Sequence, residues 1–165
     1  MTTVDQEVTG AELRGFMRSW TTGVAVVTSS HLGLPTGCTV NAFTSVSLRP
    51  PLVLVSLAET SRTLAVITHR QVFGVNLLTA RQTVLAARFA SSASDRFVGL
   101  DYRTEHGVPL FTEALATMAC TVDQTIAAAD HVLVLGRPIL PILLGGRQEA
   151  EPAVFFDGRY RSLSG

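Results

Sequence analysis

GCTVNAFTSVSLRPPLVLVSL, the stretch from Gly37 to Leu57, contains two predicted strands separated by a pair of prolines. The first strand, Cys38 to Phe43, returns from a hairpin loop. Leu48 to Pro51 interrupts the pattern, because two prolines cannot lie in a central strand. Leu52 to Leu57 alternates little between apolar and polar residues, which predicts a strand buried on both faces. Short strands joined by turns favour a fold made mainly of β-structure.

The flanking sequence continues in short elements. Thr9 and Glu12 form a capping box that predicts a helix from Gly10 to Ser19, with its aromatic stripe in the core. Two more helices are predicted: a short one capped by Thr60 or Ser61 that ends near Thr68, and Thr79 to Ala90 with Val84, Leu85 and Phe89 inward. The other predicted strands are Gly23–Thr28, Val72–Leu77, Leu115–Thr125, His131–Leu140, Ala153–Phe156 and Arg159–Leu163.

The remaining segments are predicted to be irregular. Residues 101–113 are polar and contain glycine and proline, so they are expected to form a loop. Gly145 to Glu151 is expected to be the most mobile segment. Six or seven short strands with helices between them predict a single domain over residues 1–165. Its expected architecture is mainly β with helices, a closed or partly closed barrel with peripheral helices.

Composition excludes several classes of protein. The formal net charge is zero, so a broad electrostatic surface for nucleic acid is not expected. All 13 cationic side chains are arginine, and the absence of lysine excludes a lysine Schiff base and a P-loop. No apolar run reaches the roughly 18 residues that a membrane span needs. The polar, acidic start is unlike a signal peptide, which predicts a cytoplasmic protein.

The cysteines and histidines match no metal-binding pattern. Cys38 and Cys120 lie far apart in sequence, and free buried thiols are the expected state. The four histidines are scattered, so no zinc site is expected.

Two stretches suit ligand binding. Thr39 to Ser47 is strand-like but dense in small hydroxyl and amide side chains, which let a planar ligand approach the backbone. An amphipathic strand with one polar face is the simpler alternative. Ser61, Arg62 and Thr63 lie where a helix begins, and the free N–H groups there favour a phosphate. Ordinary helix capping explains the same residues.

Two further positions carry similar alternatives. Arg88 and Phe89 end a predicted helix, where an arginine also complements the helix dipole. Ala129-Asp130-His131 opens a predicted strand, and the aspartate would orient the histidine or raise its pKa. A hydrogen-bonded structural histidine is the alternative to a catalytic one.

Taken together, six stretches resemble the flavin reductase family with the FMN-binding split barrel. The similarity is to the small reductase component of two-component flavin-dependent monooxygenases, and it covers a core from about residue 13 to residue 163. The stretches are WTTGVAVVT (Trp20–Thr28), the opening stretch Gly37–Leu57, FGVNLL (Phe73–Leu78), AARFA (Ala86–Ala90), DRFVGL (Asp95–Leu100) and ADHVLVLG (Ala129–Gly136).

The resemblance implies an antiparallel, Greek-key-like barrel and a flavin site, for FMN or FAD, on the matching residues. The flavin ring and ribityl chain would contact Thr39, Val40, Asn41 and Ala42, with Ser45 and Val46 nearby and Ser56, Leu57 and Ala58 on the next strand. The phosphate would be held by Ser61, Arg62 and Thr63, with Arg88, Phe89 and Ser92. His131 would lie near the nicotinamide of NADH, with NADPH as the alternative donor, and Tyr160 would help to form that site.

The function that the resemblance implies is an NAD(P)H-dependent flavin reductase. Hydride would pass from nicotinamide C4 to flavin N5 in a homodimer, and the reduced flavin would serve a partner monooxygenase. The alternatives are a flavoprotein that retains its flavin and reduces another acceptor, a non-catalytic flavin-binding module, and a barrel that binds an apolar small molecule. One residue departs from the family pattern: Ala129 replaces the usual glycine, at a cost of about 1 kcal/mol if φ is positive there.

Overall fold

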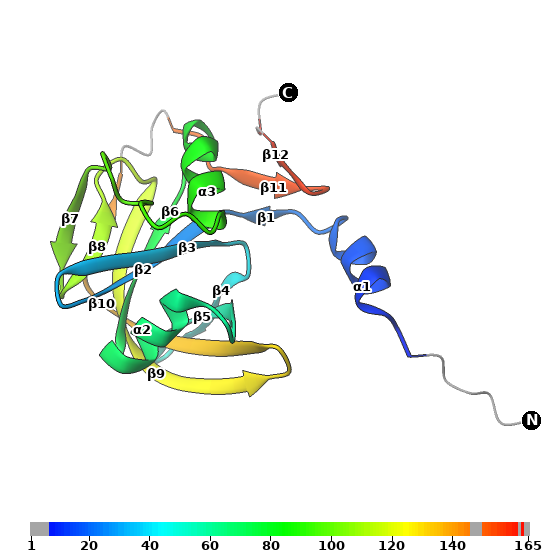
Figure 1. Ribbon diagram of the computed structural model, residues 1–165, viewed down its shortest axis with the longest axis horizontal. Coiled ribbons are helices and arrows are strands. Elements are labelled where there is room, and N and C mark those ends of the chain that lie inside the picture. The colour runs from blue at the N-terminus through cyan, green and yellow to red at the C-terminus, as the bar shows by residue number, and fades with distance from the viewer. Residues whose placement is uncertain (1–6, 146–149, 162, 164–165) are drawn as a thin grey trace, which may run out of the picture.

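The computed structural model describes residues 7–145, 150–161 and 163, and it shows a mainly β fold with peripheral helices (Figure 1). The helices are α1 (Gly10–Met17), α2 (Arg62–Arg70) and α3 (Thr83–Ala90), with a 3₁₀ helix, η1 (Ala80–Gln82), before α3. The strands are β1 (Thr22–Gly23), β2 (Ala25–His31), β3 (Leu34–Val40), β4 (Phe43–Leu48), β5 (Pro51–Ala58), β6 (Val72–Leu77), β7 (Tyr102–Glu105), β8 (Val108–Phe111), β9 (Ala116–Ala128), β10 (His131–Leu144), β11 (Val154–Phe156) and β12 (Arg159–Arg161).

The main sheet curls until its two edges meet. Its seven antiparallel strands follow the order β3-β2-β6-β9-β10-β5-β4. The edge strands β3 and β4 are joined by only two residues, Asn41 and Ala42. A link this short spans roughly 11 Å between Val40 and Phe43, so the two edges have to lie close together, and β3 also contacts β5. This arrangement confirms the predicted barrel-like fold.

The inner face of the curled sheet forms the main hydrophobic core. In β5, Val53, Val55 and Leu57 are buried in this core, whereas the residues between them are only partly buried. The prediction that this strand is buried on both faces is therefore wrong, because no element of the described chain covers its outer face completely. Leu64 and Ile67 of α2 join the same core.

A second core lies under α3, which packs beside β2 and β3 (Figure 1). Ala86 and Phe89 face inward, and the Phe89 ring meets Phe97 edge to face at 5.0 Å. Val84 was expected inward, but it is 81% exposed. The α-helical turns begin at Thr83, after the 3₁₀ segment, and this change shifts the phase of the buried positions.

Residues 101–113 contain the β7–β8 hairpin, so the prediction of a loop there is wrong. All four residues of β8 are buried. Hydroxyls of β2 fasten the hairpin, since Thr28 donates to the Pro109 carbonyl and Ser30 donates to the Gly107 carbonyl, each at 2.5 Å. Four-residue strands are too short to show a sequence period, and the polar turn between them dominates the composition.

The buried amide of Asn76 links three strands. Its Nδ2 donates to the Val26 carbonyl at 3.1 Å, and its Oδ1 accepts from the Phe111 N–H at 2.7 Å. Asn76 is fully buried, so loss of the amide would leave the buried Phe111 N–H without the acceptor that it has here. A single side chain thereby fixes β2, β6 and β8 to one another.

Helix α1 stands away from the barrel (Figure 1). The predicted capping box is present, since Thr9 Oγ1 accepts from the Glu12 N–H and Glu12 accepts from the Thr9 N–H. The expectation that its aromatic stripe enters the core is wrong: Phe16 is 74% exposed and Trp20 is 65% exposed. The chain turns away after α1, and no other described element covers this face.

Local signals predicted several other elements correctly. The structure confirms the strand from Val72 to Leu77, the β9–β10 hairpin and the tight turn at Asp157-Gly158, where both residues have positive φ. The predicted mobile segment Gly145–Glu151 includes residues 146–149, which lie outside the described residues. None of the helices in the described part of the chain has the length and apolar character needed to cross a bilayer.

Candidate functional site

A surface hollow of about 320 Å³ lies where β3, the start of α2 and the end of α3 come together. Figure 1 shows the two helices on either side of β3. Six of its lining residues are ones that the sequence assigned to a flavin: Thr39, Ser61, Arg62, Thr63, Phe89 and Ser92. The remaining lining residues are Cys38, Thr60, Ala90, Ser91 and Arg96, so no described residue of the lining is acidic.

The N-terminus of α2 supplies the anion-binding character of this hollow. Ser61 is the N-cap, and its Oγ accepts from the Leu64 N–H at 3.3 Å. The first turn of α2 contains no acidic residue, so the positive end of the helix dipole is uncompensated there. Arg62 is exposed beside it and donates to the Ser92 carbonyl at 3.3 Å. Free N–H groups, a guanidinium and hydroxyls form a set that suits a phosphate.

Three other predicted residues have defined places around the hollow. Thr63 is 2% exposed, and its hydroxyl lies 3.3 Å from that of Thr36. The Phe89 side chain belongs to the second core, so a ligand would meet mainly its edge or its main chain. Thr39 Oγ1 donates to the Ala86 carbonyl at 2.6 Å and ties β3 to α3.

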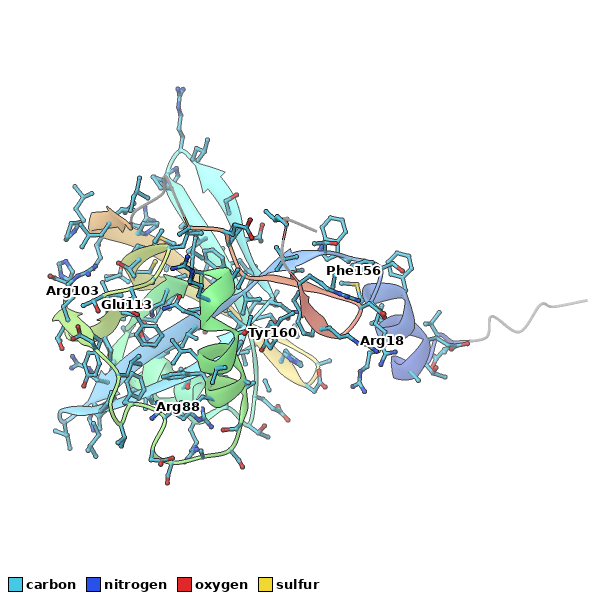
Figure 2. All side chains as sticks on the ribbon, turned by 90° about the horizontal axis from the view of Figure 1, so that it is seen from above. Arg18, Arg88, Arg103, Glu113, Phe156 and Tyr160 are labelled. Carbon is cyan, nitrogen blue, oxygen red and sulfur yellow. The ribbon has the colours of Figure 1, made fainter. Side chains whose placement is uncertain are left out.

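Arg88 is directed away from the hollow. Its Nη2 donates to the carbonyls of Asp95 at 2.8 Å and Val98 at 2.6 Å. Figure 2 shows Arg88 at the end of α3 that faces this following loop. In this conformation the guanidinium orders the loop, and the hollow receives its second cation from a different arginine.

That second cation is Arg96, which sequence reasoning did not place in the site. Arg96 Nη1 donates to the Gly37 carbonyl in β3, two residues before Thr39, at 2.6 Å. Its Nε is buried and lacks a hydrogen-bond partner. The only sequence signal was the stretch DRFVGL, which contributed to the resemblance without a role.

The pKa of the Cys38 thiol depends on the residues around the hollow. Burial raises the pKa of this thiol, and hydrogen bonds from Thr63 and Ser61 together with the charge of Arg96 oppose that effect. The arginine charge therefore reaches the floor of the hollow, where β3 passes beneath α2.

The end of β5 connects the hollow to the predicted nicotinamide residue. Ala58 and His131 are directly paired across β5 and β10. The Ser61 N–H donates to the Ala58 carbonyl at 2.9 Å, and the Glu59 N–H donates to the Asp130 carbonyl at 3.0 Å. The N-terminus of α2 and the β9–β10 turn are therefore held on opposite sides of the same strand end.

His131 is an exposed residue beside this strand end. Its Nδ1 lies 2.8 Å from Asp130 Oδ1. A carboxylate only accepts hydrogen bonds, so Nδ1 carries the proton and Nε2 is the ring nitrogen that remains for a ligand. The hydrogen bond from His131 and its charge lower the pKa of the Asp130 carboxyl. Ala129 lies two residues before His131 and has a φ of +54°. This is the positive φ considered above for the position where the family usually has glycine.

The remaining predicted flavin contacts follow the β3–β4 link and the two neighbouring strands. Val40 and Leu57 are buried in the main core, so a ligand would meet them through the main chain. Asn41, Ala42 and Ala58 are exposed, and the Ser56 N–H donates to the Ala42 carbonyl at 3.0 Å. Ser45 and Val46 lie farther along β4 and are also exposed.

Tyr160 lies on a different part of the surface from His131. It is on β12 and packs against Phe155 with ring centroids 5.6 Å apart. Phe155, Asn41 and Trp20 border a second hollow of about 260 Å³. Figure 1 shows β12, which carries Tyr160, at the opposite end of the molecule from the β9–β10 turn. Within one chain the structure therefore does not bring Tyr160 and His131 together.

Comparison with known proteins identifies the family of this chain. The sequence model described as "Flavin reductase like domain" matches residues 17–164. The chain belongs to the flavin reductase-like family. Among its described residues no group of three or more potential metal ligands lies together.

The relatives of this flavin reductase-like chain include reductases of several named kinds. An NADH-dependent flavin reductase of a Rhodococcus species is 36% identical over 167 residues, 97% of this chain and 90% of that protein. The reductase subunit HsaB of a flavin-dependent monooxygenase from Rhodococcus jostii is 33% identical over 91% of this chain and 76% of that protein. A probable flavin reductase of Rhizobium meliloti is 42% identical, but this chain spans only 41% of its length. It spans 55% of the Rhizobium meliloti stachydrine N-demethylase reductase subunit Stc3.

Solved structures of two flavin reductases share the fold. The flavin reductase PheA2 superposes with a TM-score of 0.86 at 35% identity, over 96% of this chain and 100% of that one. The Streptomyces globisporus NADH:FAD oxidoreductase SgcE6, in complex with NAD and FAD fragments, superposes with a TM-score of 0.85 at 32% identity, over 94% of this chain and 96% of that one.

Proposed function

We propose that this chain is an NAD(P)H:flavin oxidoreductase that supplies reduced FMN or FAD to a partner flavin-dependent monooxygenase. The observation that carries the proposal is the continuity of one surface: the anion-binding hollow, the exposed β3–β4 link and His131 all adjoin the end of β5. The names of the relatives support it, since they include an NADH-dependent flavin reductase and a monooxygenase reductase subunit.

The residues present fit a flavin with a phosphorylated tail. The hollow has two guanidiniums and several hydroxyls but no acidic residue in its described lining. Ala42 and Ala58 are small and exposed, so they leave the main chain accessible to a flat ring system. In this proposal the side chains of Asn41 and Ser56 supply directional hydrogen bonds to the polar edge of the rings. When bound, the flavin supplies the hydride-accepting chemistry.

His131 positions the dinucleotide in this scheme. Hydride transfer needs the two reacting atoms about 3–3.5 Å apart in aligned orientation, and it needs no side chain to act as acid or base. Asp130 fixes the orientation of the imidazole through the Nδ1 hydrogen bond, which presents Nε2 to the ligand. The protein contribution is then placement of the nicotinamide C4 atom over the flavin N5 atom.

Steady-state assays that cross NADH and NADPH with FMN, FAD and riboflavin test the proposed activity directly. Oxidation of the dinucleotide that depends on added flavin is expected. Flavin that remains bound through gel filtration, with turnover only on another acceptor, would favour a retained-flavin oxidoreductase. Absence of dinucleotide oxidation with every flavin would favour a non-catalytic binding module and would overturn the proposal.

The role of His131 has its own test. His131→Ala is expected to raise KM for the dinucleotide at least about tenfold and to lower kcat less, because a binding interaction is lost while no proton transfer is affected. Loss of turnover with an unchanged KM would contradict a positioning role. Glu59→Ala is a suitable control, because Glu59 contributes its main-chain N–H to the turn and this substitution keeps that group.

We also propose that the enzyme is a homodimer, because one chain leaves a large apolar surface uncovered. Leu13, Phe16, Met17 and Trp20 are all between 47% and 74% exposed on or just after α1. Figure 2 shows Phe156, which is 39% exposed, close to the same helix. An exposed apolar patch of this kind is typical of an interaction surface, and a second copy of the chain would cover both patches at once.

Sedimentation velocity tests the dimer. Phe16→Asp with Trp20→Ser should shift the wild-type dimer to a monomer, whereas Leu32→Asp, at an exposed apolar position in the β2–β3 turn, should not. A wild-type chain that sediments as a monomer and reduces flavin at full rate would refute it. A cytoplasmic location completes the proposal, since both described cysteines are free thiols, as is usual in a reducing compartment.

A further inference from the structure

We propose that His31 and His69 form a chelating site for a divalent transition metal ion of the Cu²⁺ and Ni²⁺ class. Their imidazole rings have centroids 4.6 Å apart and planes at 84° to each other. His31 ends β2 and His69 lies in the last turn of α2, so only the tertiary fold brings the two rings together. The pair lies at the other end of α2 from Ser61 and its hollow, and the inference does not depend on the proposed function.

The ring nitrogens of these two histidines make no hydrogen bond to the described residues. The other two histidines differ, since His106 and His131 each have an oxygen 2.8 Å from a ring nitrogen. His31 is partly buried and His69 is exposed, so an ion from solvent can reach both rings. A neutral imidazole has one nitrogen lone pair that can bind a metal. The pair therefore offers two lone pairs that no described group occupies.

Well-packed elements hold the main chain of both histidines in place. Along β2, Val27 lies in the main core with Ile67 of α2, and the Ser29 hydroxyl donates to the main chain at the start of β6. Side chains alternate along a strand, so His31 continues the same face of β2 toward the end of α2. Ile67 is fully buried two residues before His69, which fixes this turn of the helix against β2. Metal binding would therefore need only rotation of side chains on a fixed scaffold.

The spacing of the rings suits neighbouring positions on one metal ion. An imidazole nitrogen binds Zn²⁺ at about 2.0–2.1 Å, and with bonds of this length two rings held roughly 90° apart around one ion have centroids roughly 4.5 Å apart. The 4.6 Å between His31 and His69 is close to that value. Because His69 is exposed, its ring can rotate about the side-chain torsions and direct a nitrogen at an ion held by His31.

The ligand set favours Cu²⁺ or Ni²⁺ over other cations. Nitrogen ligands without a carboxylate suit a transition metal, whereas Mg²⁺ and Ca²⁺ prefer oxygen ligands. Among the described residues no third potential metal ligand joins the pair, and a closed structural zinc site takes four. Water would complete the coordination, as the tetragonal geometry of Cu²⁺ and Ni²⁺ allows. The neighbouring cation, Arg70, reaches toward the β7–β8 turn, since a Cβ on Gly107 would lie 3.1 Å from its Nη2.

Titration of the protein with CuCl₂, followed by calorimetry and by electron paramagnetic resonance, tests the site. Cu²⁺ is the probe because it binds nitrogen ligands more tightly than Ni²⁺ does. One ion per chain is expected, with nitrogen hyperfine structure from two imidazoles. His31→Asn and His69→Asn should each weaken binding at least about tenfold, since each variant leaves a single ligand. His106→Asn is the matched control and should change the affinity by less than about twofold.

Thermal unfolding with NiCl₂ provides a second readout. The ion should raise the Tm of the wild-type and His106→Asn chains and leave that of His69→Asn unchanged. Because His69 is exposed, its replacement should leave the metal-free Tm within about 2 °C, which separates a lost ligand from a lost fold. Cu²⁺ binding that persists in both His31→Asn and His69→Asn would assign the ion to other groups and overturn the proposal. A wild-type chain that takes up no Cu²⁺ would overturn it as well and leave only a contact between two rings.

Discussion

Replacing Ala129 with glycine is expected to stabilise the protein. Ala129 has φ +54° in the two-residue turn that joins β9 to β10, and Asp130 is not in the left-handed region. Positive φ at the first central residue alone is the pattern of a type II′ turn, where that residue is normally glycine. An alanine in the left-handed region is strained by about 1–2 kcal/mol.

The net gain is smaller than this strain, because glycine adds conformational entropy to the unfolded chain. That entropy costs about 0.5–1 kcal/mol. The difference leaves a stabilisation of about 0.5–1 kcal/mol, which corresponds to a rise in Tm of about 1–4 °C for a domain of this size. Differential scanning calorimetry of the wild-type and Ala129→Gly proteins at equal concentration measures the shift.

Ala128→Gly is the matched control. Ala128 directly precedes the turn, at the end of β9, and does not have positive φ. Glycine there should therefore lower stability by about 0.5–1 kcal/mol. If Ala129→Gly lowers Tm as much as Ala128→Gly does, the turn is not strained and the reasoning fails.

Three other perturbations have defined outcomes. Asn76→Ala removes the amide hydrogen bonds to the Val26 carbonyl and from the Phe111 N–H, and it should lower the free energy of unfolding by about 2–4 kcal/mol in urea titrations, with circular dichroism as the readout. Gly136→Ala would place a Cβ 2.7 Å from Phe73 Cε1 and should cost about 1–3 kcal/mol, and Phe73→Leu in the same chain should recover part of the loss. Burial raises the pKa of the Cys120 thiol from 9.0 to about 12. The unfolded chain therefore loses this proton first, and stability should fall as pH rises from about 9 to about 12. Urea midpoints of Cys120→Ala should show a weaker dependence, since burial also raises the pKa of Cys38 and Tyr160, which remain.

Elements whose signals are local were predictable from the sequence. Ser61 caps α2 and Asp157-Gly158 forms a tight turn, because side-chain capping and turn conformation depend on a few adjacent residues. The failures have a different cause. The helical spacing of apolar residues in α1 predicted that one face of the helix is apolar. This spacing cannot identify which part of the structure, if any, covers that face. The β7–β8 hairpin failed because its strands are too short to show alternation.

In the candidate site, too, the residues with local sequence signals were predictable and those brought in by tertiary contacts were not. Ser61 and Arg62 belong to one helix start, and their phosphate-binding character was visible in three consecutive residues. Arg96 comes from a turn far along the chain and reaches Gly37 only through the packing of α3 beside β3. Pairing of Ala58 with His131 likewise depends on strand order, which the sequence pattern leaves open.

The two-residue link between β3 and β4 creates a seam in the barrel wall. Among the described strands, β3 pairs only with β2 and β4 pairs only with β5, so no ladder of main-chain hydrogen bonds crosses the seam. Widening the barrel at any other place breaks such a ladder, whereas parting the two edges near Asn41 breaks none. The wall therefore lacks main-chain hydrogen bonds beside Asn41, and a proposed flavin that is a released substrate would enter and leave at this place without breaking a ladder.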